Sequence, residues 1–443
     1  MPIEKRNILF SETPAYKELS STRKELLDDL QKGAFNYFID QANPQNGLVA
    51  DSLMANGPSS IAAIGFALPV YALGVEHGWM RRQEAVERTL AVLRFFSNYT
   101  NTADANQVSY QGFYYHFLDM KTGQRVWQSE LSTIDTSILM AGVLAAQAYY
   151  QQDNEAENEI RLLSERLYSQ VNWQWALDCG STTVSHGWKP ESGFLPYCWQ
   201  GYDEALLLYV LGLGSPTYPL PASSYQAWTS TFEWKTIETI SFLFAGPLFI
   251  HQFSHIWIDF RGIQDHFMSE HHSNYFENSR KAAYVSRQYA IQNPHGFKGY
   301  GQDIWGISAC DGPIGNAGPI NIKGNRFWGY LARGVPGPDD GTLAPWTVIA
   351  SLPFATEIAL PAIETYLKQY PHLHGKYGMM SSFNLSYPRK TDGLDGWYSN
   401  NNSGVDVGPV VLMIENFRNG FVWQLMKGLP CIANGLKRAG FSS

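Results

Sequence analysis

Acidic residues stand at the edges of strongly apolar segments, where charge is unusual. Glu130 and Asp135 begin the segment SELSTIDTSILMAGVL, Asp203 and Glu204 directly precede ALLLYVL, and Glu415 sits inside VVLMIEN. An ionised carboxylate is costly to bury without partners, so each position indicates either a structural contact such as a helix cap or chemistry. The two acid pairs would face the same mouth if both segments are buried helices. Glu204 is the strongest candidate for a carboxyl group with a perturbed pKa.

Aromatic residues flank these acids in segments rich in glycine and proline. They are Trp188, Tyr197, Trp199, Tyr202, Trp305, Trp346 and Trp397. An aromatic ring packs against the C–H face of a sugar while neighbouring polar groups bind its hydroxyls. Any single ring could belong to the core, but their clustering favours a sugar-binding cleft. Two carboxylates across such a cleft are typical of glycoside hydrolysis.

Two histidines, His251 and His255, have the i, i+4 spacing of metal ligands on one helix face. A zinc protease with this pattern needs glutamate after the first histidine, and Gln252 occupies that position. Three more histidines follow between residues 266 and 272. Hydrogen-bonded histidines lining a polar cavity explain the group better, so we expect no catalytic metal and no other cofactor.

Helical periodicity recurs along the chain in two forms. Residues 81–99 and 154–171 carry apolar stripes with polar residues opposite, as in helices with one face in water. Other segments are apolar nearly all round, which is typical of helices buried on every side. These segments cover residues 61–75, 129–149, 204–213 and 410–425. About twelve helices are expected, one of them at 238–253, and the alternation predicts an all-α toroid of inner and outer helices.

Residues 294–345 are rich in glycine, proline and aromatic side chains. Long loops in compact domains are usually functional or disordered, and the aromatics favour a structured, functional loop. In an α/α barrel the loops at one end of the inner helices form the active face. We therefore expect residues 294–345 to form a wall over the mouth.

Composition excludes several function classes. The 443 residues are 44% hydrophobic, 14% aromatic and only 16% charged, with a net charge of −8, which argues against disorder and against a coiled coil. The chain has no basic run, so we expect no nucleic-acid binding. The four cysteines, Cys179, Cys198, Cys310 and Cys431, lie outside any CxxC motif and are expected to be small buried hydrophobes.

The N-terminal sequence MPIEKRNILFSETP lacks the apolar stretch of a signal peptide, and no apolar window of about 18 residues spans a membrane. We therefore expect no membrane association and a cytoplasmic location, or a periplasmic one if a signal was removed. The chain is predicted to divide into an N-terminal extension, 1–20, and a single catalytic domain, 21–443. We expect a monomer.

Short motifs carry a resemblance to a known family. They are SIAAIGF (60–66), GFYYH (112–116), SELSTIDT (129–136), SGF (192–194), GYDE (201–204), GPLFIH (246–251), YFENS (275–279), FKGYG (297–301), IWG (304–306), DGTLAPW (340–346) and MIEN (413–416). With these motifs the chain resembles glycoside hydrolase family 144, the bacterial β-1,2-glucanases long called putative glucoamylases. The resemblance covers nearly the whole chain.

This resemblance implies an (α/α)6 barrel and inverting cleavage of β-1,2-linked glucan or its oligosaccharides. It assigns Glu204 of the GYDE motif as the general acid and leaves the general base open between Asp135 and Glu130. The expected substrate-binding residues are Trp188, Trp199, Tyr202, Asp203, His251, Lys298, Trp305, Trp346 and Glu415.

Three modes of action fit these motifs equally: endo cleavage, release of the disaccharide sophorose from one chain end, and transglycosylation. A different class is a glycan-binding barrel that has lost its chemistry. A polysaccharide lyase is a further alternative, which would need a tyrosine or histidine base and a cation to neutralise a uronic acid. Convergence of two carboxylates in one aromatic cleft would favour the hydrolase.

Overall fold

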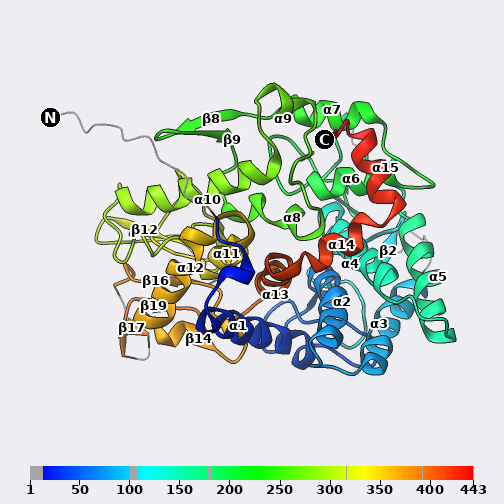
Figure 1. The fold of residues 1–443 in the computed structure, drawn as a ribbon, viewed down its shortest axis with the longest axis horizontal. Coiled ribbons are helices and arrows are strands. Elements are labelled where there is room, and N and C mark those ends of the chain that lie inside the picture. The colour runs from blue at the N-terminus through cyan, green and yellow to red at the C-terminus, as the bar shows by residue number, and fades with distance from the viewer. Residues whose placement is uncertain are drawn as a thin grey trace.

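The computed structural model describes residues 13–99, 108–177, 182–315, 317–388, 390–391 and 393–442. Within these residues the chain forms fifteen α-helices and short antiparallel strands (Figure 1). Six helices form the inner layer: α2 (Ile61–Glu76), α4 (Thr133–Tyr149), α6 (Leu206–Gly214), α8 (Phe253–Trp257), α11 (Pro345–Ala350) and α13 (Gly404–Asn419).

The inner helices are buried because their sequences are apolar on every face. Every residue of α6, α8 and α11 is buried, and α2 is buried continuously from Ile61 to Gly74. Neighbouring inner helices pack on one another, and α13 packs on α2, which closes the ring. The predicted all-α architecture of an (α/α)6 barrel is thereby confirmed.

The outer layer consists of helices with one wet face. They are α1 (Ser21–Asp40), α3 (Arg82–Ser97), α5 (Glu155–Ser169), α10 (Tyr275–Gln292), α12 (Leu352–Gln369) and α15 (Pro430–Arg438). Figure 1 shows α3, α5 and α15 at the periphery with α2, α4 and α6 inside them. Side-chain caps begin three of these helices: Ser20, Asn154 and Asn274 each accept a hydrogen bond from a backbone N–H of the first turn.

The remaining elements are short. The helices are α7 (Ala222–Thr229), α9 (His266–Glu270) and α14 (Phe421–Lys427), and the 3-10 turns are η1 (Tyr16–Glu18), η2 (Trp175–Leu177), η3 (Leu248–His251) and η4 (Pro371–Leu373). The strands are β1 (Ser59–Ser60), β2 (Ser109–Tyr110), β3 (Phe113–Tyr114), β4 (Phe117–Leu118), β5 (Leu131–Ser132), β6 (Gly187–Lys189), β7 (Gly193–Phe194), β8 (Trp234–Ile237), β9 (Ile240–Leu243), β10 (Ala309–Cys310), β11 (Ile320–Ile322), β12 (Asn325–Phe327), β13 (Leu331–Ala332), β14 (His374–Gly375), β15 (Gly378–Met379), β16 (Phe383–Asn384), β17 (Lys390–Thr391), β18 (Leu394–Asp395) and β19 (Trp397–Tyr398).

Two helix predictions were wrong in detail. The segment 238–253 is not a helix: it holds strand β9 of a hairpin with β8, then η3, and α8 begins at Phe253. The predicted helix 410–425 is two helices, because Gly420 adopts φ 71° and ends α13. Positive φ is accessible to glycine at little cost, which makes it a common helix terminator.

The segment 294–345, here called the wall, contains four short strands and is held by a buried ion pair. Arg333 is fully buried and donates to both carboxylate oxygens of Asp340, at 2.7 and 2.9 Å. Its remaining donors bind the carbonyls of Cys310 and Gly329, at 2.8 and 3.0 Å. Because every contact of this guanidinium is internal to the wall, the loop is structured, as predicted.

The chain ends pack on the barrel where they are described. Tyr16 of η1 contacts Phe417 of α13 with ring centroids 5.7 Å apart, so residues 13–20 lie against the domain that follows them. Residues 1–12 and Cys179 lie outside the described residues; Cys310 is buried, and Cys198 and Cys431 are half-buried. None of the described helices combines the length and the apolar character needed to cross a membrane.

We predict that Gly142→Ala destabilises the barrel. A Cβ at Gly142 of α4 would overlap the carbonyl oxygen of Gly65 in α2, and a Cβ at Gly65 would lie 2.5 Å from the Ile138 oxygen. Since backbone cannot move aside as a side chain can, the free energy of unfolding should fall by about 3 kcal/mol. Urea unfolding checks this, with Gly428→Ala as the control, because Gly428 has φ −72° and only ordinary contacts. Equal stability of Gly142→Ala and wild type would contradict the packing.

Candidate active site

The N-terminal ends of the inner helices meet at one mouth. The first amide of α2, Ile61 N, donates to the His116 carbonyl at 3.2 Å, and Gly404 N at the beginning of α13 donates to the Asp51 carbonyl at 2.8 Å. The His116 amide in turn donates to the Glu130 carbonyl, two residues before Ser132 caps α4, at 2.9 Å. Side chains that begin α2, α4 and α13 are therefore neighbours.

Glu204 lies half-buried at this mouth, two residues before α6. Burial raises its pKa to about 8, and the carboxylates of Asp135 and Asp203 add to the rise while His116 opposes it. A carboxyl group with this pKa keeps its proton at neutral pH. Glu204 is thus equipped to donate a proton.

Asp203 is tied into the structure beside it. Its Oδ1 accepts from the Ala205 amide at 2.9 Å and its Oδ2 from Trp228 Nε1 at 3.4 Å. Burial raises the pKa of Asp203 to about 8 despite these two hydrogen bonds. Both carboxylate oxygens of Asp203 therefore accept hydrogen bonds from the protein, and its charge also raises the pKa of Glu204 through space.

Glu130, His116 and Asp135 form a charged group on the other side. Glu130 Oε1 lies 2.9 Å from His116 Nδ1, and Asp135 Oδ2 lies 3.6 Å from His116 Nε2. Burial lowers the pKa of His116, but Asp135 and Glu130 outweigh it and raise that pKa to about 9. Burial opposes the ionisation of Glu130, yet the hydrogen bond and charge of His116 lower its pKa.

Three further carboxylates, not singled out in the sequence, belong to the same mouth: Asp51, Asp311 and Asp406. Burial, with Asp135 and Asp311 adding to it, raises the pKa of Asp51 to about 6. Burial raises the pKa of Asp406, in the first turn of α13, to about 7, although hydroxyls of Ser381 and Ser403 oppose this. Asp406 carried the same signal as Asp203, an acid before an apolar run, whereas Asp51 and Asp311 lie in loops without one.

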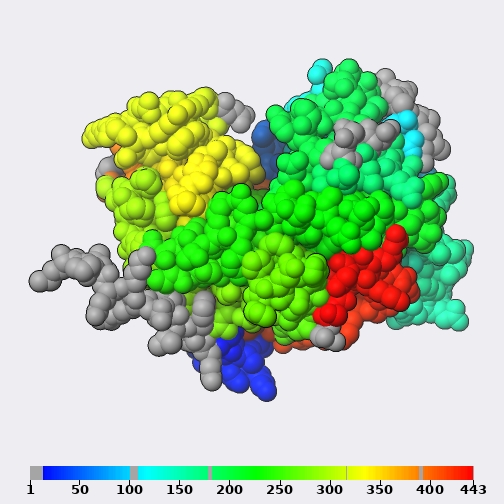
Figure 2. All heavy atoms as spheres, turned by 90° about the horizontal axis from the view of Figure 1, so that it is seen from above, coloured from blue at the N-terminus to red at the C-terminus, as the bar shows by residue number. Residues whose placement is uncertain are grey.

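A cavity of about 440 Å³ adjoins this group of acids. It is lined by Ser52, Leu53, Met54, Asp311, Gly312, Pro313, Gly315, Tyr330, Trp397, Ser399, Asn400 and Asn401. Ser52 is bridged to Ser403, which places the cavity beside the beginning of α13. Figure 2 shows the surface hollowed between the wall, in yellow, and the part of the chain drawn in green. The cavity offers room for sugar units next to the carboxylates.

Exposed aromatic rings surround the mouth. Tyr330 of the wall is 70% exposed, Tyr197 is 66% exposed, and Trp127, three residues before Glu130, is 61% exposed. Trp127 has φ 57° and packs against Phe117 at 5.2 Å, and Phe117 stacks on His116 at 3.9 Å. Tyr197 was predicted as a sugar-binding ring, whereas Trp127 and Tyr330 were not, because nothing in the sequence separates an exposed ring from a core ring.

Among the predicted sugar-binding aromatics, Trp397 of the cavity and Trp188 are half-buried. Trp188 lies on β6 opposite Leu131, the neighbour of Glu130. Trp199 is buried, stacks on His186 at 3.9 Å and donates to Thr133 Oγ1 at 3.2 Å. Tyr202 is also buried and stacks on Tyr275.

Two other predicted rings pack in the core. Trp305 is fully buried, and its carbonyl accepts the Tyr366 hydroxyl. Trp346 of α11 is buried against Phe253. The structure therefore does not present Trp305 and Trp346 as a sugar-binding surface, because large rings in glycine-rich sequence also fill the interior of the barrel.

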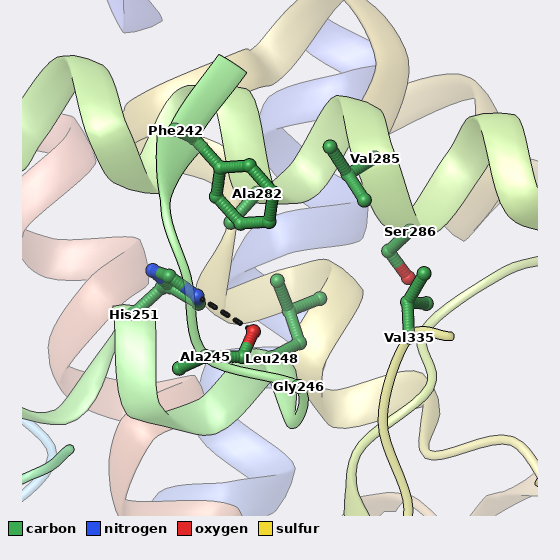
Figure 3. A pocket seen from close by; sticks show the side chains of 9 residues that line it. All are labelled: Phe242, Ala245, Gly246, Leu248, His251, Ala282, Val285, Ser286 and Val335. Carbon is green, nitrogen blue, oxygen red and sulfur yellow. Dashed lines mark hydrogen bonds between the residues drawn. The ribbon is translucent and has the colours of Figure 1, made fainter. Parts of the chain in front are cut away.

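His251 lies in the interior instead of at the mouth. Figure 3 shows it beside a void of about 10 Å³ lined by Phe242, Leu248 and Val335 among others, with Nε2 directed at the Ala245 carbonyl, 3.2 Å away. Burial lowers its pKa to about 4. The predicted contact of His251 with substrate is not supported by this position.

The second histidine of the metal-like spacing is likewise engaged. His255 Nε2 lies 2.9 Å from Ser279 Oγ, and burial lowers its pKa to about 3. Among the residues that the structure describes, no three histidine, cysteine or acidic side chains are grouped as metal ligands.

Glu415 lies away from the acids at the mouth. Glu415 is near the opposite end of α13 from Asp406, where it pairs with His77 at 2.9 Å and with Arg418. Gln31 and Asn419 complete its hydrogen bonds, so this carboxylate is engaged by the protein near the C-terminal end of α13. Lys298 is exposed on the wall, and its amide donates to Ser386 Oγ at 2.7 Å.

Comparison with known proteins identifies related sequences and folds. The family model described as "Putative glucoamylase" matches residues 196–430, just over half of the chain. An exo β-1,2-glucooligosaccharide sophorohydrolase (non-reducing end) of Parabacteroides distasonis is 27% identical over 97% of this chain. The chain spans 59% of the length of that curated relative.

Solved structures share the whole fold. A putative glucoamylase from Bacteroides uniformis is 30% identical, with a TM-score of 0.84, 96% of this chain covered and 99% of that chain. An endo-β-1,2-glucanase from Chitinophaga pinensis, solved with sophorotriose and glucose, is 25% identical, with a TM-score of 0.82 and the same coverage of both chains.

We predict that Glu204→Gln stabilises the protein at alkaline pH. The folded pKa of Glu204 lies above the unfolded value of about 4.3, so ionisation favours unfolding increasingly between these two pH values. The melting temperature of the variant should exceed that of wild type by about 2 °C or more at pH 8 and equal it at pH 4. Glu165→Gln, on the exposed face of α5, is the control. A difference that does not grow with pH would refute the raised pKa.

We predict that chelation leaves activity intact. His251 and His255 are committed to protein contacts, so removing metal ions should not disturb the carboxylates at the mouth. Dialysis against EDTA, followed by assay with and without added zinc, measures this. Reversible loss of activity with recovery on zinc would require a metal in the mechanism.

Proposed function

The chain belongs to the putative glucoamylase family, and from that premise we propose that it is an inverting glycoside hydrolase acting on β-1,2-linked glucan or its oligosaccharides. The observation that carries the proposal is the pairing of unlike carboxyl groups at one mouth. Glu204 retains a proton at neutral pH, while Asp135 faces a histidine that is cationic there. Glycoside hydrolysis needs one carboxyl in each state.

In this mechanism Glu204 is the general acid. Its proton passes to the glycosidic oxygen as the bond from that oxygen to the anomeric carbon breaks. A water molecule adds to the same carbon from the opposite face and gives its proton to a carboxylate base. The desolvation that raises the pKa of Glu204 keeps this carboxyl group protonated until the sugar binds.

Asp135 is the better base of the two candidates. Glu130 Oε1 is held by His116 in an ion pair, and the lowered pKa of Glu130 makes it a weak proton acceptor. Asp135 Oδ2 accepts Ser132 Oγ at 2.5 Å, whereas Oδ1 has no hydrogen-bond partner among the described residues. The free oxygen of Asp135 is thus available to a water molecule.

The substrate class follows from the surroundings and from the relatives. Exposed rings of Tyr330, Tyr197 and Trp127 offer flat apolar surfaces to sugar faces, and the 440 Å³ cavity supplies polar side chains for hydroxyls. The relatives described above are a sophorohydrolase and an endo-β-1,2-glucanase. We propose β-1,2-glucan or its oligosaccharides as the substrate, bound by a monomer.

We predict that wild type cleaves linear β-1,2-glucan and that Glu204→Gln cleaves it with a much lower kcat. Loss of general-acid help should lower kcat by roughly 10²–10⁴-fold, with less change in KM, because glutamine keeps the shape without the acidic proton. Product chromatography measures both: a ladder of oligosaccharides indicates endo action and a single disaccharide indicates exo action.

Glu165→Gln, on the exposed face of α5, should be as active as wild type. Wild-type binding without cleavage would replace the hydrolase with a glycan-binding protein, and a product that absorbs in the ultraviolet would indicate a lyase. Near-normal turnover by Glu204→Gln would make Glu204 structural and move the acid elsewhere.

A further inference from the structure

His116 occupies the centre of the charged group at the mouth. It lies between β3 and β4, and its ring stacks on Phe117 at 3.9 Å with an interplanar angle of 13°. Its amide donates to the Glu130 carbonyl and its own carbonyl accepts the first amide of α2, so the backbone on both sides is fixed. The ring therefore has little freedom to turn.

Each ring nitrogen of His116 faces a different carboxylate. Nδ1 lies 2.9 Å from Glu130 Oε1, and Nε2 lies 3.6 Å from Asp135 Oδ2. An imidazole can serve acceptors at both nitrogens only in its protonated form, where both carry hydrogen. The ring thus makes a hydrogen bond with Glu130 through Nδ1 and lies within ion-pair distance of Asp135 through Nε2, an arrangement that suits an imidazolium.

The two carboxylate oxygens of Asp135 have different surroundings. Oδ2 faces His116 and accepts Ser132 Oγ at 2.5 Å, while Ser132 Oγ also accepts the Asp135 amide at 3.1 Å. Oδ1 receives no hydrogen bond from the described residues. A carboxylate held by one oxygen presents the other in a fixed direction, which is what activation of one water molecule requires.

We propose that His116 is a positioning residue that orients Asp135, through the ion pair with its Oδ2, for its role as general base. This inference rests on the function proposed above. Hydrolysis needs Asp135 to lose its proton while the neighbouring Glu204 keeps its own, and a cation placed against Asp135 favours that distribution. Glu130 serves as the counter-charge of His116 and takes no part in the chemistry.

The carboxylates that face His116 all raise its pKa. Glu130, Asp135 and Asp51 favour its protonated form, and its charge in turn opposes protonation of Glu204. Replacing His116 with a neutral residue therefore removes a positive charge that lies beside Asp135 and that opposes protonation of Glu204. The whole bell-shaped pH profile of kcat should then move to higher pH, since its acid limb reports the base and its alkaline limb the acid.

The test is the pH profile of His116→Gln on linear β-1,2-glucan, with wild type measured first. We expect a lower kcat, a smaller change in KM, and an acid limb shifted upward by about one pH unit or more. Lys189→Gln is the matched control. The positive charge of Lys189 acts on Glu130 through space, and the substitution removes an equal charge from the same rim. Its acid limb should stay in place.

The outcomes separate this inference from the function on which it rests. An inactive wild type refutes the proposed function, whereas an active wild type with an unshifted His116→Gln profile refutes the role of His116 alone. Equal shifts in His116→Gln and Lys189→Gln would mean that any positive charge at the rim has the same effect, and would also overturn the proposed role of His116.

If circular dichroism shows that His116→Gln does not fold, Glu130→Gln replaces it. That variant keeps the imidazole but removes its anchor, so His116 should lose its proton at lower pH. An uncharged imidazole no longer opposes protonation of Glu204, so the alkaline limb should move up. An alkaline limb that stays in place would overturn the proposal.

Discussion

A carboxyl group that must keep its proton stands beside one that must lose its own, and the mouth of this barrel is organised around that constraint. Burial raises the pKa of Glu204, Asp203 and Asp406 there. A local cation is what makes one site different. His116 supplies it on the Asp135 side, while Glu204 faces mainly negative neighbours.

The barrel creates this arrangement by bringing the beginnings of its inner helices together. Acids far apart in the chain, Asp51, Asp135, Glu204 and Asp406, reach one mouth because each stands at or near the beginning of an inner helix or in a loop bonded to one. The close approach of α2 and α4 at Gly65 and Gly142 sets the distance between two of these helices. Backbone packing in the interior thereby determines the geometry of the charged groups at the surface.

The sequence was sufficient for the architecture and for part of the mouth. Apolar and amphipathic helices differ in periodicity, so the two layers of the barrel were predictable, and Glu204 and Asp135 were visible as acids at the beginnings of apolar helices. The hairpin at β8 and β9 was missed, because a short apolar stretch of about ten residues fits a strand or a helix equally well.

Binding residues were harder to predict, since a sequence does not show which ring is exposed. Trp305 and Trp346 fill the core, whereas Trp127 and Tyr330 stand in solvent at the rim. Glu415 has the same apolar neighbours as Glu204 but lies near the other end of its helix, where Arg418 and His77 neutralise it. His116 was part of a recognised motif, yet its role depends on Glu130 and Asp135, whose positions come only from the fold.

Action of Glu204 and Asp135 as acid and base from opposite faces of the sugar determines the configuration of the newly formed reducing end. Proton NMR recorded during early cleavage of β-1,2-glucan distinguishes the two anomers before they equilibrate. Attack by water opposite the leaving oxygen predicts that the α-anomer appears first. Initial appearance of the β-anomer would indicate a covalent, retaining mechanism and would contradict the account.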